Sequence, residues 1–479
     1  MIKMQTDLEK LGYKQELKRN LNYFDNFSIA FAFISATTGI FSLFGMGLST
    51  GGPSFVWTWP AVFIGQLLVS LTLAEVASHY PLSGSIYNWT KHLVNDTYAW
   101  FAGWIYLVAS LITIAAVNVG GAPYIAQMMG WDAGNHNTLL MIVIFMVLLQ
   151  TLINSFGVKL TAMINNIGMV AEVGAMIVLA AVLLAVGIHQ PFDIVFETAG
   201  TEGSGSYLPV FLSAMLMSVF VLYGFESAGS LAEEVINPRR IVPRAIISSL
   251  VITFICGGIL IIALVLSISD LTAVMQSEVP VMEILSTNLG AGVANAFVIL
   301  AVIAILVCGT AIQASVARLL YSLGRDRKIP GSKLWLKISP KYETPIAAIL
   351  FTGIFTVLLT SASSTLSYLV NMCIAGIYIA YLSIAIGALI ARKRGWNAYT
   401  SPWNLGKWGV HINILALSWL VFGFINLCWP RTPDAPWYVN YSIPLLVGCV
   451  FLIGAVYYTI FVRPRHRIEV SEEKKTYAK

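Results

Sequence analysis

Long apolar stretches recur along this chain of 479 residues, and each is long enough to cross a lipid bilayer as a helix. A membrane-spanning helix needs about 20 mostly apolar residues. Division of the sequence at its polar breaks gives twelve such stretches, at 26–48, 54–78, 97–121, 138–157, 161–187, 207–233, 243–269, 291–320, 344–361, 364–391, 409–428 and 440–462. Because hydrocarbon satisfies no backbone hydrogen bond, each stretch must be helical. The sequence therefore predicts an all-α polytopic membrane protein with twelve transmembrane helices.

Composition excludes a soluble enzyme, since 57% of the residues are hydrophobic and only 11% are charged, whereas soluble domains carry roughly 25% charged residues. The gaps between spans are too short for a folded soluble domain. The five cysteines form no CxxC pair and have no histidine cluster beside them. They are expected to be small core residues, and we expect no metal site and no cofactor.

Basic residues indicate how the chain is oriented, because cytoplasmic loops retain Lys and Arg. With the N-terminus inside, all of the 28 basic residues except Arg431 fall in cytoplasmic segments or at cytoplasmic helix ends. We expect both tails, 1–25 and 463–479, in the cytoplasm of a multi-pass protein of the cell membrane. The net charge of +5 then belongs to the inner membrane face, and no nucleic-acid partner is expected.

Three carboxylates lie inside predicted spans, where an ionisable group is costly and is by default a functional candidate. Glu172 is near the middle of span 5, Glu226 is just past the middle of span 6, and Glu75 is toward the inner end of span 2. A structural bond to a neighbouring helix is the alternative for Glu172 and Glu226. It is the expected role of Glu75, which has water and headgroups within reach.

Two spans carry small and polar residues at the membrane midplane. Span 1 reads ISATTGIF at 34–41, and span 6 reads FVLYGFESAG at 220–229. Paired interruptions in corresponding spans of two halves indicate a transporter's binding site, although small residues also serve close helix packing. A broken span 1 would turn backbone N–H groups toward a carboxylate, and a broken span 6 would turn carbonyls toward an ammonium. Such a site suits a zwitterion.

Three blocks resemble the amino acid-polyamine-organocation (APC) transporters. They are AEVASHYPLSGSIYNW at 74–89, ESAGSLAEEVINPRRIVPRA at 226–245, and RLLYSLGRD at 318–326 with the later Ile329-Pro330 and Thr344-Pro345. The entry LGYKQELKR at 11–19 and Gly51-Gly52-Pro53 resemble the amino acid/choline subgroup, which includes permeases for 4-aminobutyrate and choline.

The resemblance implies an inverted-repeat fold of the LeuT type. The first five-span repeat would cover 26–187 and the second 207–391, with two peripheral spans at 409–462. Substrate would lie between spans 1, 3, 6, 8 and 10. The substrate-binding residues expected on this basis are Ser35, Ala36, Thr37, Thr38, Gly39, Phe220, Tyr223, Gly224 and Glu226.

Some of these positions differ from the family pattern or carry more than one interpretation. The family's glycine-serine-glycine turn falls on 37–39, so Thr37 adds a side chain that would narrow the carboxylate pocket or add a ligand. Phe220 is expected to be a mobile aromatic lid, with a core role as the alternative. Glu172 stands where proton-coupled relatives carry a lysine, with Thr310 of span 8 facing it. It would take up a proton, help to bind sodium, or form a structural bond.

These features favour a secondary active transporter for an amino acid or small amine such as 4-aminobutyrate. It would work by alternating access as a symporter or antiporter, coupled to protons or exchanging substrates. The alternative is a non-transporting membrane sensor of the same fold. A membrane enzyme is disfavoured because the midplane lacks a His/Asp or Cys/His constellation. A channel is disfavoured by the absence of a charge ring, and direct ATP drive by the absence of a Walker motif.

Overall fold

The computed structural model describes residues 13, 17–203, 205–362, 365–431 and 435–464. Within these ranges the regular structure is helical, and the extended pairing consists of one isolated parallel bridge between Leu21 and Val235. The predicted all-α class is thereby confirmed. Most of the expected tail at 463–479 and much of the one at 1–25 lie outside the described residues.

Among the described residues, ten helical segments are long and apolar enough to span a membrane. They are α2 (Tyr23–Ile34) with α3 (Ala36–Gly51), η1 (Pro53–Trp57) with α4 (Thr58–His79), α6 (Asp96–Met128), α7 (His136–Ser155), α8 (Val158–Val186), α11 (Pro238–Leu266), α13 (Pro280–Arg325), α16 (Leu366–Lys393), η5 (Gly406–Trp408) with α17 (Gly409–Cys428), and α19 (Ser442–Tyr457) with η6 (Tyr458–Val462). Two shorter apolar helices, α9 (Tyr207–Val221) and α15 (Ile346–Ala362), cover the remaining expected spans.

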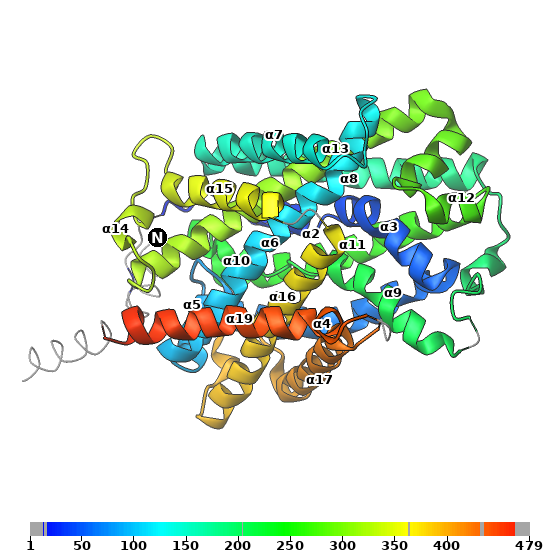
Figure 1. The fold of residues 1–479 in the computed structure, drawn as a ribbon. Helices are drawn as coiled ribbons and strands as arrows, with labels where there is room; N and C mark the ends of the chain where they lie inside the picture. Colours follow the sequence, from blue (N-terminus) through cyan, green and yellow to red (C-terminus); the bar gives the residue numbers. More distant parts are fainter. Residues whose placement is uncertain (1–12, 14–16, 204, 363–364, 432–434, 465–479) are drawn as a thin grey trace, which may run out of the picture.

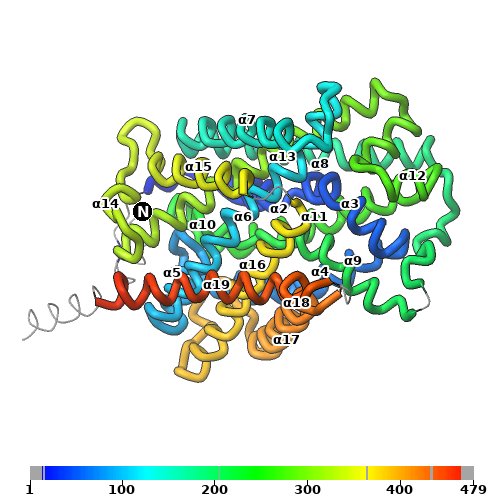
Figure 2. Tube along the Cα trace, viewed as in Figure 1, coloured from blue at the N-terminus to red at the C-terminus, as the bar shows by residue number. Residues whose placement is uncertain are grey.

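Short helices connect these segments. They are α5 (Ile86–Leu93), η2 (Phe192–Phe196), α10 (Ser227–Ser230), η3 (Ala232–Glu234), α12 (Leu271–Gln276), α14 (Ser332–Trp335), η4 (Ala398–Thr400) and α18 (Trp437–Asn440). The long helices run side by side as a bundle, with α7 and α15 along one side and α17 and α19 along the opposite side (Figures 1 and 2).

The core of the bundle is formed by the first and third spans. Each spanning segment contains an apolar stretch of 18 residues. Of this stretch, 94% is buried in the α2–α3 segment and 83% in α6, compared with 11% in the α19–η6 segment. Helix α6 packs against both α13 and α16, and α3 packs against α9. A surface of α19 is therefore left for lipid, while α2, α3 and α6 lie inside the bundle.

Two helices break inside this core, at the positions where the sequence predicts interruptions. Helix α2 ends at Ile34, and Ser35 has a φ of 37°, in the left-handed region, before α3 begins. Helix α9 ends at Val221, and Gly224 has a φ of 103° before α10 begins. Each break leaves helix-terminal N–H and C=O groups without a partner in their own helix. Such groups are tolerated at this depth because they are buried in protein.

Candidate functional site

The two helix breaks pack directly against each other. A Cβ atom added to Gly39 of α3 would lie 2.8 Å from Cγ1 of Val221, the last residue of α9. A Cβ atom on Gly224 would overlap the ring of Phe33 in α2. Because real side-chain atoms do not approach this closely, glycine at both positions is required for the contact. Residues that are far apart in the sequence thus meet at one central place.

Glu172 of α8 binds the break in the first span. Its Oε1 accepts hydrogen bonds from Ser35 Oγ at 2.7 Å and from the backbone N–H of Thr37 at 3.1 Å. Both donors lie at the N-terminal end of α3, where the helix dipole favours a negative charge. Ser35 Oγ also accepts from the N–H of Thr38 at 3.2 Å, so it caps the same helix. The structure thus places the carboxylate of span 5 against the interruption predicted in span 1.

Thr310 is placed differently from the expectation. Its hydroxyl donates to the carbonyl of Leu306 in its own helix at 2.8 Å, and its carbonyl accepts from Asn154 Nδ2 of α7 at 3.0 Å. Threonines in helices often bond back to the preceding turn, since the hydroxyl reaches the carbonyl four residues earlier. On α13 the residue that faces the first break is instead Cys308, whose Sγ donates to the carbonyl of Phe33 at 3.3 Å.

Glu226 lies two residues beyond Gly224 and joins three helical segments. Tyr106 of α6 donates to its Oε1 at 2.9 Å, and Tyr381 of α16 donates to its Oε2. The hydroxyl of Tyr381 also accepts from the N–H of Gly224 at 3.1 Å. Both oxygens of this buried carboxylate are therefore held by phenol hydroxyls. We call Glu226, Tyr106 and Tyr381 the carboxylate–tyrosine triad.

Phe220 and Tyr223 line the other edge of the second break. Their rings meet edge to face, with centroids 5.5 Å apart. The hydroxyl of Tyr223 lies 3.0 Å from Thr113 Oγ1 of α6 and donates to Cys373 Sγ of α16 at 3.4 Å. Phe220 is 7% exposed, more than the neighbouring Val221 at 0%. The aromatic pair thus packs where α6, α9 and α16 converge.

All nine expected substrate-binding residues lie at these two breaks. Ser35 is the N-cap of α3 and Ala36, Thr37, Thr38 and Gly39 are its first residues, while Phe220, Tyr223, Gly224 and Glu226 surround the second break. Sequence reasoning missed Tyr106, Tyr381 and Cys308, which complete the contacts. The resemblance named spans 3, 8 and 10 as site helices, but it does not distinguish these three residues from the other side chains of those spans.

Glu75 forms the structural bond expected of it. Arg392 of α16 pairs with its Oε2, and the N–H of Leu405 donates to its Oε1 at 2.9 Å. The carboxylate thus ties α4 to α16 and to the segment that follows α16. Among the described residues, no group of three or more His, Cys, Asp or Glu side chains could hold a metal ion.

Comparison with known proteins agrees with this geometry. The model of a family described as amino acid permease matches residues 24–451. The chain is 29% identical to amino-acid permease BAT1 of Arabidopsis thaliana, over 93% of this chain and 92% of that protein. It is 25% identical to amino-acid permease 2 of Neurospora crassa, over 94% and 86% of the two chains.

An uncharacterized amino-acid permease of Schizosaccharomyces pombe is 26% identical over 97% of this chain and 90% of its own. The match of the family model spans both helix breaks and both central carboxylates. The resemblance to APC transporters is therefore confirmed, while the narrower likeness to the amino acid/choline subgroup stays a prediction. The chain belongs to the amino acid permease family, whose members are membrane transporters and not enzymes.

Proposed function

We propose that this protein is a secondary active transporter that moves an amino acid or a small amine, such as 4-aminobutyrate, by alternating access. The observation that carries the proposal is the direct packing of two broken helices at the centre of the bundle, each beside a buried carboxylate. Broken helices are costly in a membrane and serve to bind polar cargo between two halves of a transporter.

The two breaks offer complementary polarity to a zwitterion. The start of α3 presents N–H groups and the positive end of a helix dipole, which attract a carboxylate. The end of α9 leaves carbonyls without intrahelical partners, and Glu226 adds negative charge beside them. An ammonium group is therefore best placed near Gly224, with Phe220 as the aromatic cover over it. The printed names of the relatives, amino-acid permeases, support this class of substrate.

Glu172 is the proposed coupling residue. It already accepts two hydrogen bonds from the break in the first span, so a change in its protonation would alter the geometry of the α3 N-terminus directly. Burial in low dielectric disfavours the charged form of a carboxylate, which makes proton uptake accessible. Proton symport or exchange is the proposed mode, and a role as sodium ligand is the alternative use of the same oxygens.

The carboxylate–tyrosine triad supports a second role for Glu226. Its bonds to Tyr106 and Tyr381 cross from the third span through the sixth to the tenth. In the proposed topology these bonds close the cytoplasmic side of the site, and they must break if α6 and α16 separate. Of the two roles that the sequence leaves open for Glu226, contact to an amino group and a bond across spans, these contacts support the second without removing the first.

The topology is part of the proposal. The distribution of Lys and Arg supports cytoplasmic termini in the cell membrane, which puts the end of α13 near Arg325 on the cytoplasmic side. The two repeats proposed at 26–187 and 207–391 each contribute one broken first helix. A sensor of the same fold would keep both breaks but would not release substrate on the far side.

Transport assays in proteoliposomes test the proposal. Purified full-length protein would be offered labelled amino acids, 4-aminobutyrate, choline and polyamines, with and without imposed proton and sodium gradients. Accumulation or counterflow of at least one amino acid or amine is expected, together with competition by related zwitterions. Binding without movement for the whole panel would contradict transport and favour the sensor.

A further inference from the structure

The N-terminal segment crosses the end of the bundle where α13 terminates. The N–H groups of Asn20 and Leu21 both lie 2.9 Å from the carbonyl of Glu234, and the N–H of Ile236 donates to the carbonyl of Leu21 at 2.8 Å. Lys18 pairs with Glu343 in the segment that precedes α15. These contacts hold residues 18–21 against the α10–α11 junction and the segment that precedes α15. Tyr13 lies against the polar side chains that join the helix ends.

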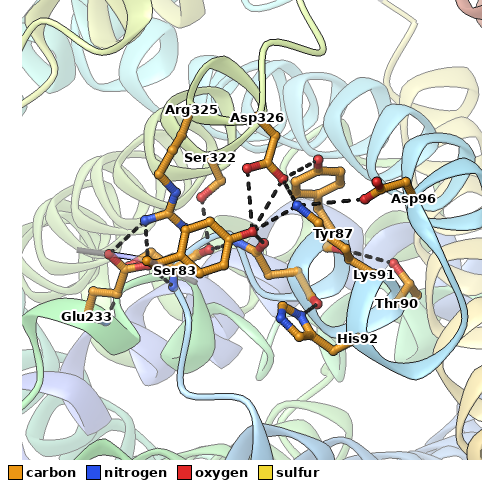
Figure 3. A network of polar contacts seen from close by, with 12 residues as sticks. Ser83, Tyr87, Thr90, Lys91, His92, Asp96, Glu233, Ser322, Arg325 and Asp326 are labelled. Atoms are coloured by element: carbon orange, nitrogen blue, oxygen red, sulfur yellow. Dashed lines mark hydrogen bonds and ion pairs between the residues drawn. The ribbon is translucent and has the colours of Figure 1, made fainter. Parts of the chain in front are cut away.

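Those side chains form a network that Figure 3 shows from close by, and we call it the cytoplasmic network. It joins α5, the end of α13 and the α10–α11 junction. Lys91 of α5 pairs with Asp326 at the end of α13, and Tyr87 Oη donates to Asp326 Oδ2 at 2.7 Å. Arg325 Nη1 donates to both oxygens of Glu233, at 3.0 and 3.1 Å.

Backbone contacts tie the same three parts together. Ser322 Oγ of α13 donates to the carbonyl of Ser83 at 2.9 Å, while the N–H of Ser83 donates to Glu233 Oε1 at 3.0 Å. Ser83 lies between the second and third spans, in the first proposed repeat. Ser322 and Glu233 lie in the second proposed repeat. The network therefore fastens the two proposed halves of the transporter at their cytoplasmic end.

Tyr13 completes this network from outside the bundle. Lys91 Nζ donates to its hydroxyl at 2.9 Å, and that hydroxyl lies 3.4 Å from both oxygens of Asp326. Its ring lies 4.0 Å from the guanidinium carbon of Arg325. Nε and Nη2 of Arg325 are buried and have no hydrogen-bond acceptor in the described part of the chain. The aromatic face thus covers a cationic edge that no oxygen satisfies.

The charge states favour these contacts. Burial and the nearby charge of Asp326 raise the pKa of Tyr13, so its phenol stays protonated and able to donate at neutral pH. Burial opposes the charged form of Lys91, but the charge of Asp326 and the hydrogen bonds to Asp326 and Tyr13 together outweigh burial and raise the pKa of Lys91 overall. Lys91 is therefore a cation that donates to Tyr13 and to Asp326 together.

We infer that Tyr13 is the latch of the cytoplasmic gate: it holds Lys91, Asp326 and Arg325 in the closed arrangement and must withdraw before the cytoplasmic side opens. The inference rests on the proposed alternating access, because only an opening movement separates α5 from the end of α13. Tyr13 then sets the balance between closed and open states without touching substrate. Tyr13 acts through the network and is a positioning residue.

Reaction of a single buried cysteine with a water-soluble thiol reagent tests the inference. Cys373 is 0% exposed and contacts Tyr223 at the second break, so it is a natural reporter of an open cavity. The other four cysteines would be replaced in the full chain. A charged, membrane-impermeant methanethiosulfonate would be added to the cytoplasmic face of inside-out vesicles, and the rate of Cys373 modification measured.

Four variants in that background separate the outcomes. We expect modification to speed up about tenfold in Tyr13→Ala and about threefold in Tyr13→Phe, which keeps the ring over Arg325 but loses the hydroxyl. Asp326→Asn disrupts the centre of the network and should also speed modification. Tyr399→Ala is the matched control, because Tyr399 is 64% exposed on the same side and contributes no hydroxyl to the network. It should react at the wild-type rate.

Two results would overturn the latch. A rate in Tyr13→Ala equal to that in Tyr399→Ala, with Asp326→Asn accelerated, would show a gate that does not need Tyr13. Unchanged rates in both Tyr13→Ala and Asp326→Asn would show that the cytoplasmic network does not control access at all. Failure of the proposed function gives a different result, since Cys373 of the wild type would then react from neither face of the membrane.

Discussion

Ser35 Oγ lies 2.7 Å from Glu172 Oε1, so the residue at which the first span breaks is bonded directly to the carboxylate of α8. Ser35 itself has a φ of 37°, a conformation that serine adopts at a cost. The bond to Glu172 and the cap on the N–H of Thr38 stabilise this strained residue from two sides. The shape of the break thus depends on an ionisable group, which supports the coupling role proposed for Glu172.

Glu172→Gln is expected to abolish proton-driven accumulation while substrate binding remains. Glutamine retains an oxygen that can accept from Ser35 and Thr37 but does not titrate. Uptake against a concentration gradient, driven by an imposed proton gradient in proteoliposomes, measures the first property, and counterflow measures the second. Undiminished accumulation in the variant would remove Glu172 from coupling. A strict sodium requirement of the wild type would assign it to the cation site instead.

Glu226→Gln tests the negative charge at the second break. The amide retains one acceptor for Tyr106 or Tyr381 but adds donors where both tyrosines already donate, so one phenol contact is lost. We expect weaker binding of cationic than of zwitterionic substrates, because the former depend more on the charge. Dissociation constants of wild type and variant for cationic and for zwitterionic substrates measure this difference. Losses within about a factor of two for each class would rule out an amine contact.

Tyr381→Phe separates gate closure from substrate contact. The variant loses the donor to Glu226 and the acceptor for the N–H of Gly224, but it keeps the ring that stacks on Phe225 with centroids 5.4 Å apart. The cytoplasmic side should open more readily, so Cys373 should react faster from that side. Tyr378→Phe on the same helix is the control, because Tyr378 bonds Gln66 and lies outside the triad. Equal rates in the two variants would contradict a closing role for the triad.

Phe220→Ala is expected to weaken substrate binding and slow occlusion while the protein still folds. An aromatic face attracts an ammonium group by about 0.5 to 2 kcal/mol, and its bulk excludes water. Phe220→Tyr preserves the face and should stay near wild type in equilibrium binding. Wild-type binding and transport in Phe220→Ala would leave Phe220 as a core residue packed on Tyr223.

Sequence reasoning located the spans and the breaks because both depend on local composition. Apolar length alone decides where a chain can cross a bilayer, and clusters of small residues around Gly39 and Gly224 mark where helices break. The resemblance added which spans surround the site. Local signals also placed Glu172 and Glu226, since a carboxylate within an apolar stretch is conspicuous.

The partners of these carboxylates could not be predicted in the same way. Tyr106 and Tyr381 lie 120 and 155 residues from Glu226, and tyrosine in a span is an ordinary packing residue. Thr310 is expected to face Glu172, but its hydroxyl bonds to a carbonyl of its own helix. No sequence pattern distinguishes such a bond from a contact across helices. Tyr13 lies in a polar tail whose position depends entirely on tertiary contacts.

Gly224→Ala is expected to destabilise the protein by roughly 1 to 3 kcal/mol, or to prevent folding, because alanine is strained at a positive φ. Its Cβ would also overlap the ring of Phe33. The matched control is Gly174→Ala in α8, where a Cβ atom meets nothing within 4 Å and alanine favours the helix. Thermal unfolding in detergent compares the two variants. Equal melting temperatures would show that the second break does not depend on Gly224.

Acidification is expected to destabilise the end of the bundle that carries α5, through His92 of that helix. Burial lowers the pKa of His92, and the adjacent Lys91 lowers it further, against the opposing effects of the Asn88 carbonyl and Asp326. The imidazole Nδ1 lies 2.8 Å from that carbonyl, a contact that the neutral ring makes as a donor. Since the folded state disfavours the proton, the stabilising contribution of His92 is complete above the unfolded pKa of about 6.5 and is lost as the pH falls below it.

Melting temperatures at pH 7.5 and 5.5 measure this loss. The decrease between the two pH values should be larger for the wild type than for His92→Gln, which does not titrate. The same pH dependence in both proteins would show that His92 is charged, or solvated, in the folded state.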